Sequence, residues 1–158
     1  MLILNVWHPD IYEFVTSKKK KDYITNANIS VAITDDFMRA VDEDAEWDLV
    51  FPDRTGVKQY DQIWNGDLKQ WKERGYKVNV YKTVKARDLW KTIIESAGAS
   101  AEPGLFFVDR ANYYSNSWYF AALNCTNPCG EQPLPEWGVC NLGAINLSKF
   151  VDTARDDV

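Results

Sequence analysis

Three side chains capable of redox and acid–base chemistry occupy alternate positions of one short segment: Asn127, Cys129 and Glu131. If this segment is extended, alternate residues point to the same side, so the amide, the thiol and the carboxyl group converge on one small volume. A thiol can donate or lose a hydrogen atom, a carboxylate can accept a hydroxyl proton, and an amide can hydrogen-bond neighbouring hydroxyls. The combination therefore suits redox or radical chemistry on a substrate that carries several hydroxyl groups.

The residues between these three also favour a special backbone. Pro128 and Gly130 fix and tighten the chain, as a loop tip inserted into a cavity requires. A surface turn with an incidental cysteine gives the same spacing, so the spacing alone leaves both interpretations open.

Strands and helices alternate along the part of the chain that must position this segment. Strands are expected over 2–6, over 28–33, where every second residue is apolar, and over 104–108. Helices are expected after His8-Pro9-Asp10, after the capping residue Thr34, and over 84–97, with Gly98 placed to end the last one. This order predicts an α/β fold with parallel strand pairing.

Three other stretches are less regular. Residues 43–77 indicate a surface excursion, in which Leu68 and Trp71 mark a short helix after Asn65-Gly66-Asp67. Residues 109–137 show no regular pattern, and an irregular span of that length inside a compact domain is usually functional. Residues 139–147 regain strand-like or core-like character.

Composition narrows the function classes. The 158 residues fit one domain, and 46% hydrophobic with 14% aromatic residues predict a substantial core. No stretch approaches the ~20 apolar residues that span a bilayer, and the start does not resemble a signal peptide, so a cytoplasmic location is expected. With a net charge of −5, the lysine run at 18–21 is expected to be a solvated helix end rather than a nucleic-acid site.

Metal and phosphate sites of familiar types are not indicated. Structural zinc sites usually combine two pairs of closely spaced Cys or His ligands, and Cys125, Cys129 and Cys140 lack the second pair, so no metal is expected. Cys125 is expected to be a small buried apolar residue and His8 a contact at a strand end or helix entry. There is no Walker loop or Gly-x-Gly-x-x-Gly loop for a nucleotide phosphate.

The aromatic residues at 113–114 and 118–120 are expected to pack the base of the irregular span.

A longer pattern resembles the ribonucleotide reductases. Residues 126–134, Thr-Asn-Pro-Cys-Gly-Glu-Gln-Pro-Leu, and 138–147, Gly-Val-Cys-Asn-Leu-Gly-Ala-Ile-Asn-Leu, are similar to the finger loop and the following strand of that family. Residues 8–11, 26–31, 34–38 and 102–107 resemble it too, in the family's order. The resemblance covers nearly the whole chain and is closest to the adenosylcobalamin-dependent class.

This resemblance implies a role for each candidate residue. Cys129 would carry the thiyl radical that removes the 3′ hydrogen of a ribonucleoside di- or triphosphate. Glu131 would take the 3′-hydroxyl proton, and Asn127 would hold the ribose hydroxyls. Cys140 would be one of two thiols that reduce the 2′ position and end as a disulfide. Adenosylcobalamin would supply the radical, and a thioredoxin-like or glutaredoxin-like dithiol would restore the thiols.

The implied fold is a fragment of the family's ten-stranded α/β barrel, with a finger loop over about 109–137. The resemblance places the partner of Cys140 before residue 1 and the phosphate-binding loop after Val158, and no cysteine precedes Cys125. The chain is therefore expected to act within a larger catalytic chain, completed by its flanks or as a homo-oligomer, and to be inactive alone. Two alternatives stay open: a non-catalytic truncated module that completes a barrel with another polypeptide, and the same chemistry with a separate radical-generating subunit.

Overall fold

A parallel sheet forms the centre of the computed structural model, which describes residues 1–19 and 24–151. Its strands are β1 (Leu2–Asn5), β2 (Ile29–Ile33) and β5 (Gly104–Phe107), in the order β1-β2-β5. Both pairings are parallel. The three expected strands and their parallel pairing are thus confirmed, while the sheet is open rather than closed into a barrel. The prediction of a solvated lysine run is wrong for Lys18, whose side chain is 15% exposed and pairs with Glu102, and for Lys20 and Lys21 it lies outside the described residues.

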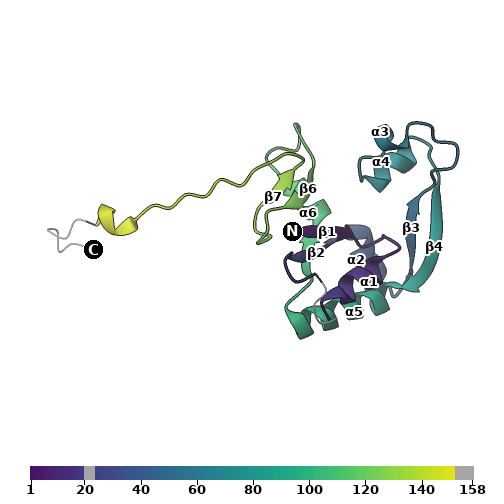
Figure 1. Cartoon of the computed structure of the whole chain (residues 1–158), viewed down its shortest axis with the longest axis horizontal. Helices are drawn as coiled ribbons and strands as arrows, with labels where there is room; N and C mark the ends of the chain where they lie inside the picture. Colours follow the sequence, from purple (N-terminus) through teal and green to yellow (C-terminus); the bar gives the residue numbers. More distant parts are fainter. Residues whose placement is uncertain (20–23, 152–158) are drawn as a thin grey trace.

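Helices cover one face of this sheet (Figure 1). They are α1 (Ile11–Thr16), continued by the 3-10 turn η1 (Ser17–Lys19), α2 (Asp35–Asp42) and α5 (Ala86–Ser100). Thr34 caps α2 as expected, since its hydroxyl accepts a hydrogen bond from Phe37 N at 3.2 Å. The core between the helices and the sheet contains Val6, Ile11, Val15, Val31, Ile33, Phe37, Val41, Leu49, Ala86, Leu89 and Ile93.

The end of α5 differs from the expectation. Gly98 does not end the helix, which continues to Ser100 and closes at Ala101, a residue in the left-handed conformation with φ 59°. The apolar stripe on Ala86, Leu89 and Ile93 is buried as the spacing predicts. Periodicity therefore located the helix, whereas its last turn depends on a backbone geometry that alanine rarely adopts.

The stretch over 43–77 is more regular than its sequence indicates. It contains β3 (Glu46–Pro52), which pairs in antiparallel fashion with β4 (Val78–Lys85), the strand that directly follows the stretch. Figure 1 shows the short helices α3 (Tyr60–Ile63) and α4 (Leu68–Glu73) at the far end of this ribbon. The short helix after Asn65-Gly66-Asp67 is confirmed, with Asp67 accepting from Gln70 N at 3.0 Å. β4 gave no signal because each of its residues is exposed or only partly buried.

The span over 109–137, in which no regular structure is expected, contains one helix and one hairpin. The helix α6 (Val108–Tyr114) follows β5 directly, and β6 (Leu123–Thr126) pairs with β7 (Pro133–Pro135) in antiparallel fashion. The expectation that aromatic residues pack the loop base is wrong for this structure. Side chains of this group are 74–79% exposed: Tyr113, Tyr114, Trp118, Tyr119 and Phe120.

The expectation of a strand or core segment over 139–147 is also wrong for this structure. Val139, Leu142 and Ile145 are 75%, 90% and 73% exposed, and up to residue 151 the only regular element after them is the 3-10 turn η2 (Leu147–Phe150). Figure 1 shows this segment as an extended trace leading away from the sheet. An extended segment becomes a strand only when a neighbour pairs its backbone groups, and the described residues offer it none. Among the described residues, no helix is long and apolar enough to cross a membrane.

Candidate active site

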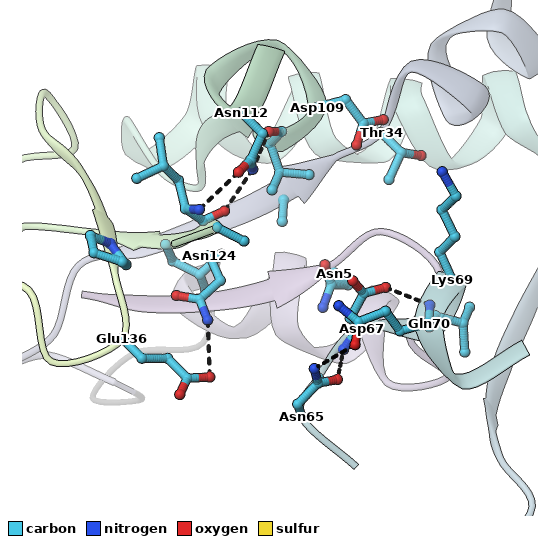
Figure 2. Close-up of a pocket in the computed structure, with 18 of the residues that line it drawn as sticks. Asn5, Thr34, Asn65, Asp67, Lys69, Gln70, Asp109, Asn112, Asn124 and Glu136 are labelled. Carbon is cyan, nitrogen blue, oxygen red and sulfur yellow. Dashed lines mark hydrogen bonds between the residues drawn. The ribbon is translucent and has the colours of Figure 1, made fainter. Parts of the chain in front are cut away.

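Hydrogen bonds hold the β6–β7 hairpin near both ends of the parallel strands. Near the carboxyl ends of the strands, the Asn112 side chain accepts from Leu123 N at 2.8 Å and donates to Leu123 O at 2.7 Å (Figure 2). Near the amino ends of the strands, Asn28 Nδ2 donates to the carbonyl of Pro128 at 2.7 Å. Since Asn28 directly precedes β2, the hairpin runs along the direction of the strands, with residue 129 near their amino ends.

The tip of the hairpin is a tight turn. Gly130 N donates to Asn127 O at 3.1 Å, and Asn127 N donates to Gln132 O at 3.2 Å. Pro128 and Cys129 are thus the two central residues, and Gly130 follows with φ +85°, a value that glycine adopts readily. Pro128 fits the first central position because its ring fixes φ near the value required there. This geometry presents Cys129 at the end of the turn, where it is exposed.

Asn127 connects two of the other candidate residues. It is only 8% exposed, and its Nδ2 donates to Glu131 Oε1 at 2.6 Å. The same nitrogen lies 4.0 Å from Cys140 Sγ, the length of a weak hydrogen bond to sulfur. Its Oδ1 accepts from Gln132 N at 3.1 Å, which fixes the orientation of the carboxamide. The structure therefore brings an amide, a carboxylate and a thiol together beside the turn.

The reason for this convergence differs from the one that the alternate spacing suggests. Residues 127–131 are not extended; the turn at Pro128-Cys129 folds Glu131 back toward Asn127. Cys129 lies at the tip, and its thiol makes no hydrogen bond with the other three side chains within the described part of the chain.

The third cysteine has a different environment. Cys125 is partly buried in β6, and its thiol donates to Leu134 O at 3.3 Å. Burial raises the pKa of this thiol, and the nearby Glu136 carboxylate raises that pKa further. A raised pKa reduces the thiolate fraction at neutral pH, so Cys125 is a poor reagent.

His8 stands at the entry of α1, as expected. Its Nδ1 accepts from Asp10 N at 3.1 Å, and its ring packs edge-on against Phe51 with centroids 5.2 Å apart. Burial lowers the pKa of His8, although Asp10 opposes that shift. The described residues contain no cluster of three or more His, Cys, Asp or Glu side chains that could hold a metal ion.

Sequence reasoning missed a cavity of about 850 Å³ at the edge where the sheet strands end. Figure 2 shows Asn5, Thr34 and Asp109 on the sheet side, with Lys69 of α4 opposite. A signal was present, since each of the first three comes at the end of or just after a parallel strand, where α/β sheets commonly bind ligands. Cys129 is not part of its lining.

Comparison with known proteins identifies the family. Residues 1–158 match the family model described as the barrel domain of ribonucleotide reductase. The chain is 41% identical, over 96% of its length, to a vitamin B12-dependent ribonucleoside-diphosphate reductase of Thermoplasma acidophilum. It is 34% identical, over 99% of its length, to a protein of the same name from Mycobacterium tuberculosis, and 32% identical, again over 99%, to the large subunit of the Vaccinia virus ribonucleoside-diphosphate reductase.

The chain spans 17%, 20% and 21% of these three relatives, about a fifth of their length. The match with the family model nevertheless extends over every residue of the chain. This chain belongs to the ribonucleotide reductase barrel-domain family.

Proposed function

We propose that this chain supplies the finger loop of an enzyme that reduces ribonucleotides to 2′-deoxyribonucleotides by a thiyl-radical mechanism. The observation that carries this proposal is the position of Asn127, which contacts both Glu131 and Cys140 beside the turn that presents Cys129. Family membership supports it, because the chain matches the barrel domain of ribonucleotide reductase over its whole length. Two relatives named as diphosphate reductases favour a ribonucleoside diphosphate as the substrate.

The radical step uses the tip of the hairpin. A thiyl radical on Cys129 takes the 3′ hydrogen atom of the ribose and becomes a thiol, which leaves a carbon radical at the 3′ position. The Glu131 carboxylate takes the 3′-hydroxyl proton, and the Asn127 amide hydrogen-bonds the ribose hydroxyls. At the end of the reaction Cys129 returns the hydrogen atom to C3′, so the thiyl radical is restored.

The reducing step uses Cys140 and a second thiol of the larger enzyme. The C2′–O bond breaks and water leaves, the two thiols supply two electrons and two protons, and a disulfide forms between their sulfurs. An external dithiol of the thioredoxin or glutaredoxin type then reduces that disulfide by exchange. Asn127 Nδ2 lies 4.0 Å from Cys140 Sγ, which supports a role for this thiol next to the amide that would bind the hydroxyls.

The initiating radical is the part of the reaction that requires a further group. We favour adenosylcobalamin, which supplies an adenosyl radical when bound, because two relatives are named as vitamin B12-dependent. The exposed thiol of Cys129 fits this role, since a radical source has to approach it closely. A separate radical-generating subunit is the second candidate, because the Vaccinia virus relative is named as a large subunit.

A non-catalytic role is the alternative from a different class of function. The open three-stranded sheet and the exposed apolar residues of 139–151 favour a module that completes a barrel with another polypeptide. Such a module would need the apolar segment but not the thiol of Cys129. The two functions therefore differ in their dependence on this one residue.

The test is a chimera in which the 158-residue chain replaces the matching segment of the Thermoplasma acidophilum reductase. We expect this chimeric reductase to form deoxyribonucleotide when adenosylcobalamin and a dithiol are present. Cys129→Ala should abolish turnover, whereas the matched control Cys125→Ala should keep most of it. Undiminished turnover by the Cys129→Ala chimera would instead assign the chain a structural role.

A further inference from the structure

A side chain from outside the hairpin holds its tip at the peptide bond just before Cys129. Asn28 lies 100 residues before Pro128, and its Nδ2 donates to the Pro128 carbonyl at 2.7 Å. The Asn28 backbone is itself fixed, since its carbonyl accepts from Leu2 N at 2.7 Å where β1 and β2 begin to pair. The donor is therefore anchored in the parallel sheet and not in the hairpin.

The Pro128 carbonyl, which accepts this bond, belongs to the central peptide group of the turn. This is the peptide group whose rotation converts one turn type into another. The Pro128–Cys129 peptide is the central peptide of the turn closed by Gly130 N and Asn127 O. Type I and type II turns differ by a flip of this peptide, and type II requires a positive φ at the second central residue. Cys129 is not among the residues with positive φ, so the turn is not type II. Asn28 holds the carbonyl in the orientation that this backbone requires.

Fixing this carbonyl also restricts the cysteine that follows. A peptide group is planar and includes the Cα atom of the next residue, so the bond from Asn28 fixes the plane in which the Cys129 Cα lies. Transfer of a hydrogen atom requires reacting atoms about 3–3.5 Å apart and aligned, and a misplacement of about 1 Å can lower a rate about 100-fold. A small rotation at the turn would move the Cys129 sulfur by a comparable distance.

We propose that Asn28 is a positioning residue for Cys129, acting through the Pro128 carbonyl and without contact with the substrate. The proposal rests on the reductase function proposed above. Because the bond is exposed and joins neutral groups, its contribution to overall stability is modest. Its effect is expected in kcat rather than in folding or in substrate affinity.

The kinetic test compares three variants of the chimeric reductase. Asn28→Asp removes the donor with little change in shape and turns carboxylate oxygens toward the carbonyl, while Asn28→Gln keeps an amide donor. Asn26→Asp makes the same charge change on the same exposed loop. We expect Asn28→Asp to lower kcat at least about tenfold with KM within about twofold, Asn28→Gln to recover part of the loss, and Asn26→Asp to match the parent.

A second measurement does not depend on activity. A nitroxide attached to Cys129 of the 158-residue chain, with Cys125 and Cys140 replaced by alanine, reports the mobility of the tip by electron paramagnetic resonance. We expect Asn28→Asp to increase that mobility and Asn26→Asp to leave it unchanged, with unaltered circular dichroism in both. An inactive chimera together with a mobile tip would refute the reductase function and leave the restraint by Asn28 standing. An active chimera whose kcat is insensitive to Asn28→Asp would overturn the positioning role, whatever the spin label shows.

Discussion

At the scale of single residues, the carboxamide of Asn127 determines the geometry of the candidate site. Its oxygen accepts from Gln132 N, and its nitrogen donates to Glu131 and lies near Cys140. Residue types and spacing were sufficient to select this asparagine and its neighbours as a group. They could not supply the geometry, because alternate positions meet on one side of a strand and residues 127–131 form a turn.

Asn127→Ala should loosen the hairpin. The substitution removes the acceptor of the Gln132 amide and the donor to Glu131, two bonds of a buried side chain. We expect a loss of about 1–3 kcal/mol in the local opening free energy of the hairpin. Hydrogen exchange of the Gln132 amide measures it directly. Asn146→Ala, which removes a similar bond to Ser148 N in the exposed tail, serves as the control and should leave Gln132 exchange unchanged.

The reactivity of Cys125 should depend on Glu136. Burial and the Glu136 carboxylate both raise the pKa of the Cys125 thiol, so less thiolate is present at any pH below that pKa. Glu136→Gln removes the carboxylate charge and should therefore lower the pKa of the Cys125 thiol. Alkylation of Cys125 should then be faster between pH 7 and pH 9, roughly the range over which thiolate forms. Mass spectrometry of iodoacetamide-treated chain checks this rate. Alkylation of Cys125 that is equally slow with Glu136→Gln would mean that burial acts alone.

At the scale of elements, the sequence predicted several of the helices and strands whose residues face the core. The alternating apolar residues of β2 and the stripe of α5 are buried, and both elements were predicted. β4 and α6 were not predicted, because neither contains a buried residue to produce a pattern. β3 was missed although Leu49 and Val50 are buried. The segment 139–147 has an apolar pattern but no partner strand, so it forms no strand in this structure.

Glu102, which lies between α5 and β5, joins η1 to β2 and should contribute stability that depends on pH. Its carboxylate pairs with Lys18 of η1 and accepts from Ile29 N at the start of β2. Burial acts to raise the pKa of Glu102, but the bonds from Lys18 and Ile29 outweigh it, so the pKa is lowered overall. A lowered folded pKa means that the stabilisation is present above the unfolded pKa of about 4.3 and is lost as the pH falls below it.

We expect Glu102→Gln to lower the free energy of unfolding by about 1–2 kcal/mol at pH 7. The difference from the parent chain should shrink as the pH falls below about 4, because both chains then carry a neutral group at this position. Urea denaturation at a series of pH values measures it. Glu95→Gln removes the exposed i,i+4 pair of Lys91 and Glu95 and should change stability by less than about 0.5 kcal/mol. A difference at residue 102 that is constant with pH would contradict the account.

At the scale of the whole molecule, the parallel sheet is open and one apolar segment is uncovered. The family model matches the entire chain, yet the chain spans about a fifth of each of its relatives. The resemblance predicted the family and the order of its motifs, and the comparisons confirmed the family. The closed barrel could not form here, because three parallel strands cannot close on themselves and the remaining strands would have to come from elsewhere.

Leu142→Asp should affect stability very differently in the 158-residue chain and in the chimeric reductase. In the 158-residue chain this side chain is 90% exposed, so the change should alter stability by less than about 0.5 kcal/mol. In the chimeric reductase, where a neighbouring strand can cover residues 139–147, the same change should cost about 2–4 kcal/mol. Thermal denaturation of both proteins makes the comparison. Equal effects in the two would show that this segment stays uncovered.

The most direct measurement is a single turnover of the pre-reduced chimeric reductase without external dithiol. With Cys125→Ala, we predict stoichiometric deoxyribonucleotide and loss of the Cys140 thiol, followed by mass spectrometry. With Cys129→Ala, we predict neither product nor oxidation of Cys140, because no hydrogen atom is removed from C3′. Formation of deoxyribonucleotide together with oxidised Cys140 in the Cys129→Ala protein would contradict the assignment of the hairpin tip as the radical site.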